Sequence, residues 1–374
     1  MLAFDRNAKR IRERTSAVSA STAGHKLQGI EAARGVAASL VVVYHAARHL
    51  HGNGEGLPWA LGIEKFGHAG VDFFFVLSGF IILFAHWGDV GVPASLPRYA
   101  ERRCTRIFPL YWPVLAANAV LAVYGSRAWS PSFSELVANV TLVPTAREPI
   151  VGVAWTLQHE MLFYALFVAL LVSRRWGLAL IGGWVLWIVA IFLGSLEAPG
   201  ARAWQVCASV YNLQFVMGMA AAWISRTWSV PRAGTVALAG AAMFFSVGIA
   251  ESRGWIDGYA DPARFLYGAA AWLFVVGIVQ HERGSELRVP SWLAVLGKAS
   301  YSIYLVHLLV LGIAYKLLVR VGFAELDAHV QHLSLVAIGI LGGVAVSKWV
   351  EYPAMGAARR WWARAVGRAE SPRG

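Results

Sequence analysis

Arg34 and His45 are the first residues of this chain whose types and spacing suggest chemistry. They lie eleven residues apart on the first long apolar stretch. In an α-helix, eleven steps of about 100° return to within about 20° of the start, with a rise of about 16 Å. The two side chains therefore share one helix face. If the helix crosses a bilayer, His45 is a buried titratable group and a functional candidate; the alternative is an anchoring Arg34 and a His45 that bonds a neighbouring helix.

The composition indicates an integral membrane protein. Hydrophobic residues make up 57% of the 374 residues, charged residues make up 14%, and the mean hydropathy is +0.54, values far from those of soluble proteins. The net charge of +12 could indicate nucleic-acid binding, but no polar stretch is long enough for a basic domain. We therefore predict no nucleic-acid partner and regard the basic residues as topology signals. Cys104 and Cys207 give neither a disulfide framework nor a metal-binding spacing.

Ten apolar segments are close to the roughly 20 residues that a helix needs to span a bilayer. They cover approximately residues 29–50, 66–86, 107–124, 153–172, 176–194, 204–225, 233–250, 262–280, 294–318 and 331–350. Residues 132–150 are too short and too polar, so we assign them to an interfacial helix and loop. The predicted fold is an all-α, polytopic integral membrane protein with about ten transmembrane helices.

The basic residues predict the orientation of these helices. With the amino terminus in the cytoplasm, 21 of the 33 Lys and Arg residues fall on the cytoplasmic side and eight on the outer side. The positive-inside rule then places both termini in the cytoplasm, and we expect a multi-pass protein of the inner (plasma) membrane. The predicted parts are a disordered, basic cytoplasmic tail (1–26), a transmembrane domain (27–355) and a second basic cytoplasmic tail (356–374).

Counting residues from the predicted helix ends places two acids near the depth of His45. His45 and Asp72 each lie about 7 to 9 Å below the outer face, and Glu160 enters the fourth span to a comparable depth. A carboxylate beside an imidazole can fix its tautomer and stabilise its protonated form. The alternative for each acid is a structural hydrogen bond between helices.

Arginines gather at the opposite, cytoplasmic face. Arg103 and Arg106 are spaced i,i+3 at the start of the third span. With Arg34 they would form a phosphate clamp, because guanidinium groups bind phosphate oxygens in pairs; topology-setting charge is the alternative. We expect Glu351, at the inner end of the tenth span, to pair with this cluster. His307, near the middle of the ninth span, is expected to position other groups rather than to catalyse.

A metal site is the weakest of the chemical interpretations. His45 and His49 are spaced i,i+4, which could place two imidazoles on one metal ion. A third ligand, such as His51 or His68, would have to come from a loop, and the carboxylate motifs of helical metal sites are missing. We therefore predict no metal ion.

Six segments together resemble the acyltransferase-3 family of membrane acyltransferases, over about residues 26 to 355. In order, these segments are Arg34 with His45, Gly-Val-Asp72-Phe-Phe-Phe-Val-Leu-Ser-Gly-Phe, Arg103-x-x-Arg106-Ile-x-Pro-x-Tyr-Trp, Trp155-Thr-Leu-x-x-Glu160-x-x-Phe-Tyr, Ser300-Tyr301-Ser-Ile-Tyr304-Leu-Val-His307 and Glu351-Tyr-Pro. The second segment is most similar to the exopolysaccharide-acetylating branch of the family.

The resemblance implies transfer of an acyl group, usually acetyl from acetyl-CoA, to a sugar hydroxyl. His45, Asp72 and Glu160 are then the catalytic candidates, and Arg34, Arg103 and Arg106 the candidates for binding acetyl-CoA. Supporting roles fall to Tyr301, Tyr304, His307 and Glu351. His45, oriented by Asp72, would act as general base or would carry the acyl group covalently.

The partners that follow are acetyl-CoA as a cosubstrate, a saccharide acceptor that is free or lipid-linked, and membrane lipids; no tightly bound cofactor is expected. Two other functions stay open on the sequence. One is a transporter or flippase of a lipid-linked saccharide, whose arginines would hold a pyrophosphate. The other is an acyltransferase that acts on a small glycosylated metabolite.

Overall fold

The computed structural model describes residues 27–52, 62–124, 131–285 and 287–365, and no strand occurs in these ranges. Ten helical segments within them are long and apolar enough to cross a membrane. These segments coincide with the ten predicted from the sequence, so the prediction of an all-helical, multi-pass membrane protein is confirmed. The tail predicted for residues 1–26 lies outside the described residues.

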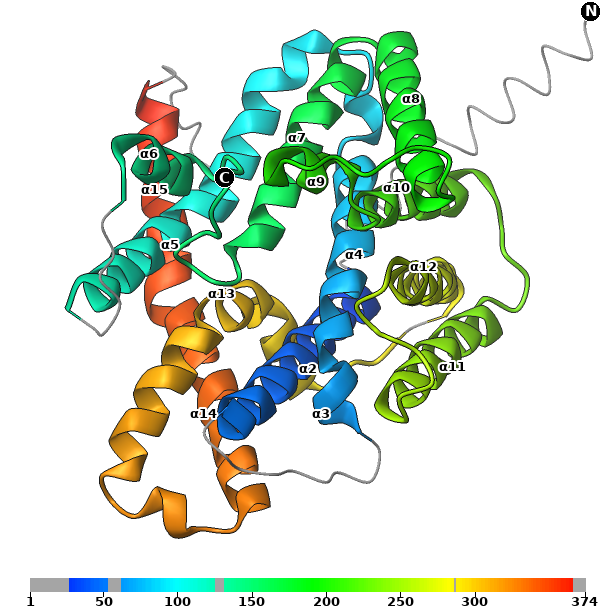
Figure 1. Ribbon diagram of the computed structural model, residues 1–374. Coiled ribbons are helices and arrows are strands. Elements are labelled where there is room, and N and C mark those ends of the chain that lie inside the picture. The colour runs from blue at the N-terminus through cyan, green and yellow to red at the C-terminus, as the bar shows by residue number, and fades with distance from the viewer. Residues whose placement is uncertain (1–26, 53–61, 125–130, 286, 366–374) are drawn as a thin grey trace, which may run out of the picture.

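The helices follow one another as shown in Figure 1. Their bounds are α2 (Gln28–Gly52), α3 (Ile63–Phe66), α4 (Gly70–Ala85), α5 (Leu96–Tyr124), α6 (Phe133–Thr141), α7 (Ala154–Val172), α8 (Arg174–Phe192), α9 (Arg202–Ala208), α10 (Tyr211–Thr227), α11 (Ala233–Ser252), α12 (Asp261–Gly284), α13 (Ser291–Val319), α14 (Ala328–Val346) and α15 (Tyr352–Ala365). A π-helical turn, Ser347–Glu351, joins α14 to α15. Helix α15 includes residues 356–365 of the predicted C-terminal tail.

Polar caps and glycines explain where helices begin and how closely they pack. Ser132 and Glu135 form a capping box at the start of α6, so the segment 132–150 contains the short helix expected of it.

Between α4 and α10, an added Cβ at Gly79 would overlap the carbonyl oxygen of Phe215, and one at Gly218 that of Val76. Small residues of this kind let helix backbones approach closely in a membrane.

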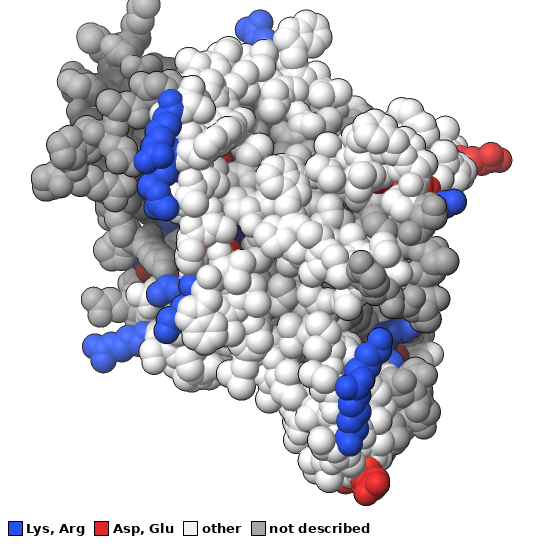
Figure 2. Space-filling model, turned by 90° about the vertical axis from the view of Figure 1, so that its left-hand side faces the viewer, with Lys and Arg blue, Asp and Glu red and all other residues white. Residues whose placement is uncertain are grey.

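Helix α4 lies in the centre of the molecule, between α2, α7, α10 and α12 (Figure 1). We call the end where α2 and α5 begin the arginine end, after Arg102, Arg103 and Arg106, and the end where α2 stops the histidine end, after His45 and His49. Figure 2 shows one face of the molecule, on which charged side chains lie along the margins and the middle is almost uncharged. Such a face is suited to contact with lipid tails.

Helices α2 and α13 cross in close contact at two glycines near the arginine end. An added Cβ at Gly35 would lie 2.8 Å from the backbone nitrogen of Gly297, and one at Gly297 would overlap the carbonyl oxygen of Glu31. Because Arg34 precedes Gly35, this contact brings its side chain to the residues that follow Gly297 on α13.

We expect Gly297→Ala to lower the free energy of unfolding by about 1–3 kcal/mol, since the added methyl forces two backbones apart. Gly312, on the same helix, has no heavy atom within 4 Å of a built Cβ, so Gly312→Ala should leave stability unchanged or raise it by up to about 1 kcal/mol. Equilibrium unfolding in mixed micelles measures both. Equal effects of the two substitutions would contradict the close contact.

Candidate active site

A cavity of about 610 Å³ lies at the arginine end, between α2, α4, α5, α7 and α15. Its charged lining residues are Arg34, Arg102, Arg103, Arg106, Arg359, Glu101 and Glu160. Five guanidinium groups face two carboxylates, so the walls carry an excess of positive charge. Such a cavity favours an anionic ligand with more than one negative group.

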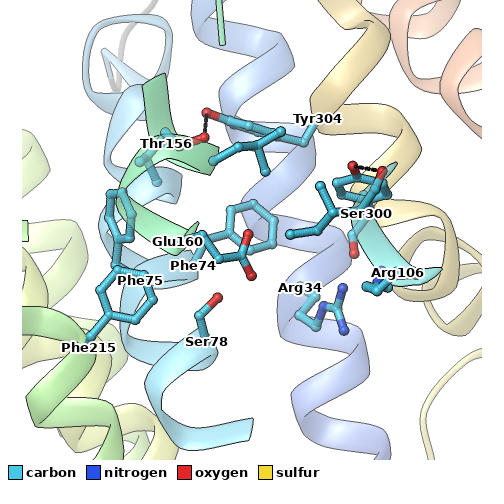
Figure 3. A pocket seen from close by; sticks show the side chains of 14 residues that line it. Arg34, Phe74, Phe75, Ser78, Arg106, Thr156, Glu160, Phe215, Ser300 and Tyr304 are labelled. Carbon is cyan, nitrogen blue, oxygen red and sulfur yellow. Dashed lines mark hydrogen bonds between the residues drawn. The ribbon is translucent and has the colours of Figure 1, made fainter. Parts of the chain in front are cut away.

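The guanidinium of Arg34 is available to a ligand. Figure 3 shows Arg34 beside Arg106 on one side of the pocket, and Glu160 with Ser78 on the other. Among the described residues, Arg34 forms no hydrogen bond or ion pair, whereas Glu160 accepts a hydrogen bond from the hydroxyl of Tyr164. Arg34 therefore supplies uncompensated donors to the cavity.

Arg106 is held by a buried carboxylate, as expected from the sequence. Nη1 of Arg106 donates to Oε1 of Glu351 at 2.7 Å. The other carboxylate oxygen of Glu351 accepts from the hydroxyls of Ser302, at 2.6 Å, and Ser347, at 3.0 Å. Glu351 is fully buried and belongs to the π-helical turn. These bonds tie α5, α13 and the start of α15 together and fix the direction of Arg106.

Arg103 is fixed from another side, by the histidine that follows α4. Burial lowers the pKa of His86, which favours the neutral ring. Nδ1 of His86 donates to Oδ2 of Asp89 at 2.8 Å, and its Nε2 accepts from Nη2 of Arg103 at 3.3 Å. The guanidinium also lies over the ring of Tyr164, with its central carbon 5.4 Å from the ring centroid. Arg103 is thus held in place, and no carboxylate in the described part of the chain forms an ion pair that would neutralise its charge.

The cavity continues into a narrower pocket of about 100 Å³ that reaches α13. Arg34, Arg106 and Glu160 line both spaces, and Tyr301 and Tyr304 line the inner one. The hydroxyl of Tyr304 donates to Oγ1 of Thr156 at 3.0 Å, and that of Tyr301 donates to the carbonyl oxygen of Ile107 at 2.9 Å. The two tyrosines therefore hold α13 against α7 and α5, which sets the shape of the pocket.

One helical turn beyond Tyr304, two imidazoles face each other. The ring centroids of His45 on α2 and His307 on α13 are 5.0 Å apart, and those of Tyr304 and His307 are 5.8 Å apart. His307 is fully buried. Arginines, tyrosines and histidines thus follow one another along α2 and α13, from the arginine end to the histidine end.

The family sequence model described as "Acyltransferase domain" matches residues 27–351. The chain belongs to the acyltransferase-3 family. It is similar to the exopolysaccharide production protein ExoZ of Rhizobium meliloti, with 31% identity over 82% of this chain and 98% of ExoZ. It is also similar to the acyltransferase MdmB of Streptomyces mycarofaciens, with 27% identity over 88% of this chain and 92% of MdmB. No solved structure is significantly similar to it.

Asp72 of this acyltransferase lies near α10 rather than beside His45. Nε2 of Gln214 donates to Oδ1 of Asp72 at 2.7 Å, and Asp72 is fully buried. Among the described residues, no hydrogen bond joins Asp72 to His45, so the expected orientation of His45 by Asp72 is wrong. Counting residues gives the depth of a side chain but not its direction: Asp72 faces α10, and His45 faces α13.

Glu160 lies in the arginine cavity rather than level with His45. The expected depth assumed that α7 begins at the outer surface of the molecule. In the structure the residues at its start, Val151, Val153 and Ala154, are buried, so α7 begins inside the protein. Glu160 is the seventh residue of this helix and lines the same pocket as Arg34 and Arg106.

The three other histidines considered as metal ligands do not share a centre in the described part of the chain. His49 packs edge-on against Tyr315, with ring centroids 4.9 Å apart. His68 bonds Oε1 of Glu251 at 2.7 Å and stacks on Tyr259. The side chain of His51 lies outside the described residues.

Two features of the site were missed in the sequence. Arg359 lines the cavity, but in the sequence it is one of several arginines in a segment expected to be a tail. The contact between His307 and His45 was missed because spacing within one helix says nothing about the helix it faces. The only signal was that both histidines belong to segments shared with the family.

We expect Glu351→Ala to cost about 3–5 kcal/mol of stability, since it leaves a partly buried Arg106 without its carboxylate. Glu351→Gln should cost less, because an amide oxygen can still accept from the two serines. Glu148 pairs with Arg202 at 3.2 Å and its side chain is 77% exposed, so Glu148→Ala should cost less than about 1 kcal/mol. Unfolding in mixed micelles ranks the three variants; similar costs for Glu351→Ala and Glu148→Ala would contradict the buried pair.

Proposed function

We propose that this membrane acyltransferase transfers an acetyl group from cytoplasmic acetyl-CoA to a hydroxyl of an exported or cell-surface saccharide. The observation that carries the proposal is the cavity with five arginines and its continuation to Tyr304, whose ring centroid lies 5.8 Å from that of His307. CoA combines several phosphate charges at one end with an uncharged arm that ends in the thioester. Its charge distribution matches a site that is cationic at one end only.

The phosphates would bind Arg34, Arg103 and Arg106, because a guanidinium group can donate two parallel hydrogen bonds to phosphate oxygens. The pantetheine arm would then extend past Tyr304. Its length, on the order of 15 to 20 Å, is comparable to the rise of about 16 Å between Arg34 and His45 on one helix. Bound in this way, the thioester carbonyl lies near the two imidazoles.

The acceptor would reach the imidazoles from the histidine end. The name of ExoZ, an exopolysaccharide production protein, favours a saccharide of the cell surface. The excess of Lys and Arg on one side favours an orientation in which the arginine end faces the cytoplasm, in the plasma membrane. His45 would act as general base or as a transient acyl carrier.

We expect His45→Gln to reduce acetyl transfer by at least about 100-fold, the contribution typical of a general base. His49→Gln, one turn further along α2, should retain activity, since His49 packs on Tyr315. The assay follows free CoA thiol and acetylation of a de-O-acetylated surface polysaccharide by the purified protein. Retained transfer by His45→Gln at normal protein levels would remove His45 from the reaction.

Replacing Arg103 and Arg106 together with Ala should raise the KM for acetyl-CoA at least about tenfold, because each charged hydrogen bond contributes about 1.5–3 kcal/mol. Arg174 and Arg175, both exposed at the start of α8, form a matched control that removes the same charge outside the cavity. An unchanged KM in the first variant would exclude the arginine clamp. A flippase would release no CoA from acetyl-CoA at all, in the wild type or in either variant.

A further inference from the structure

The hydrogen bond of His307 determines which of its nitrogens carries the proton. Nδ1 of His307 lies 2.6 Å from the carbonyl oxygen of Tyr304, one turn earlier on α13. A carbonyl oxygen can only accept, so Nδ1 carries the hydrogen. In the neutral ring, the lone pair that can accept a proton is therefore on Nε2.

Nε2 of His307 is buried and has no hydrogen-bond partner in the described part of the chain. A buried polar atom without a partner costs free energy, and a substrate hydroxyl that donates to Nε2 would remove this cost. The side chain is fully buried, and its ring lies 5.0 Å from that of His45. It also follows Tyr304, which lines the inner pocket.

The surroundings of His45 differ from those of His307. Its ring lies against those of Tyr44 and His307, but it forms no hydrogen bond with another described residue. A general base is normally oriented by a third group. His307 has such a group in the carbonyl of Tyr304, whereas no described residue holds His45 in this way. A nucleophile that accepts the acyl group needs only a free lone pair.

We propose that the two histidines divide the reaction: His45 carries the acetyl group, and His307 is the catalytic base that removes the proton of the acceptor hydroxyl. This inference rests on the proposed acetyl transfer from acetyl-CoA and deepens it. It also assigns to His307 a catalytic role where the sequence suggested only positioning.

In the first step, a nitrogen of His45 attacks the thioester carbonyl, a C–N bond forms and the C–S bond breaks. The sulfur leaves with the electron pair and takes up the proton that the His45 ring loses. In the second step, the acceptor hydroxyl gives its proton to Nε2 of His307 while its oxygen attacks the acetyl carbonyl. The C–O bond forms, the C–N bond breaks with its electron pair returning to His45, and the proton on His307 passes to His45.

One substitution at position 307 can remove the catalytic base and keep the hydrogen bond that holds the side chain in place. Asn at position 307 has an amide nitrogen near the place of Nδ1, so His307→Asn can keep the hydrogen bond to the carbonyl of Tyr304 but lacks Nε2. His307→Gln, with its amide further out, is the second variant. His332, also buried, bonds the carbonyl oxygen of Val43 through Nε2 at 2.9 Å and lies outside the site, so His332→Gln is the matched control.

The experiment mixes each purified variant with [1-¹⁴C]acetyl-CoA and follows three quantities by rapid quench: CoA thiol, label on the protein, and label on de-O-acetylated surface polysaccharide. We expect His307→Asn to release CoA and to accumulate labelled protein, while transfer to the polysaccharide falls at least about 100-fold. His45→Gln should acquire no label, and His332→Gln should behave as the wild type.

Hydroxylamine distinguishes a missing base from a damaged site. It is a strong nucleophile that is unprotonated at neutral pH and needs no base, so it should discharge labelled His307→Asn as fast as the labelled wild type. A merely structural defect would slow hydroxylamine and polysaccharide alike.

The inference is overturned if His307→Asn and His307→Gln transfer acetyl to polysaccharide normally. It is also overturned if both lose labelling as well as transfer, or if the wild type turns over without any label on His45. These results differ from failure of the proposed function, in which the wild type itself releases no CoA from acetyl-CoA.

Discussion

The contact between α2 and α13 is the constraint on which the rest of the site depends. At one end of the pair, Gly35 and Gly297 bring the two backbones together; at the other, His45 faces His307. Each glycine precedes the histidine on its helix by ten positions, which corresponds to a rise of about 15 Å. The two helices therefore run in the same direction and stay in contact over this length. Arg34, Tyr301, Tyr304, His45 and His307 are arranged along that seam, and α5, α7 and α15 add the other charged residues of the cavity.

The polar groups along the seam differ in how well they are satisfied. Glu351 is fully buried but bonded by Arg106, Ser302 and Ser347, so it stabilises the junction of three helices. Among the described residues, Arg34 has no hydrogen bond or ion pair, and the buried Nε2 of His307 has no partner. Desolvated and unpaired groups are costly in a membrane protein. Glu351 thus belongs to the frame, whereas Arg34 and Nε2 of His307 are the groups that a substrate would contact in the proposed reaction.

The sequence predicted the parts of the structure that depend on periodicity and composition. Ten spans, the arginine cluster and the pair between Arg106 and Glu351 follow from apolar length and charge. The sequence did not predict which neighbouring helix each side chain faces. Asp72 was assigned to the correct helix, but it bonds Gln214 on α10 rather than His45. Glu160 was misplaced because hydropathy marks where a helix is apolar, not where it enters the protein, and α7 begins among buried residues. Both errors concern packing between helices, which no single segment encodes.

The arrangement limits what can cross the membrane in the proposed reaction. Phosphate groups cannot leave the arginines for the apolar interior without a large desolvation cost, so the charged part of CoA stays at the arginine end. The pocket beyond it narrows to about 100 Å³ and is bounded by the bond between Tyr304 and Thr156. In the proposed reaction, the part of acetyl-CoA that would enter this pocket is the uncharged, extended pantetheine arm. Neither the nucleotide nor the saccharide then has to cross the membrane, because the acetyl group alone passes from one end of the seam to the other.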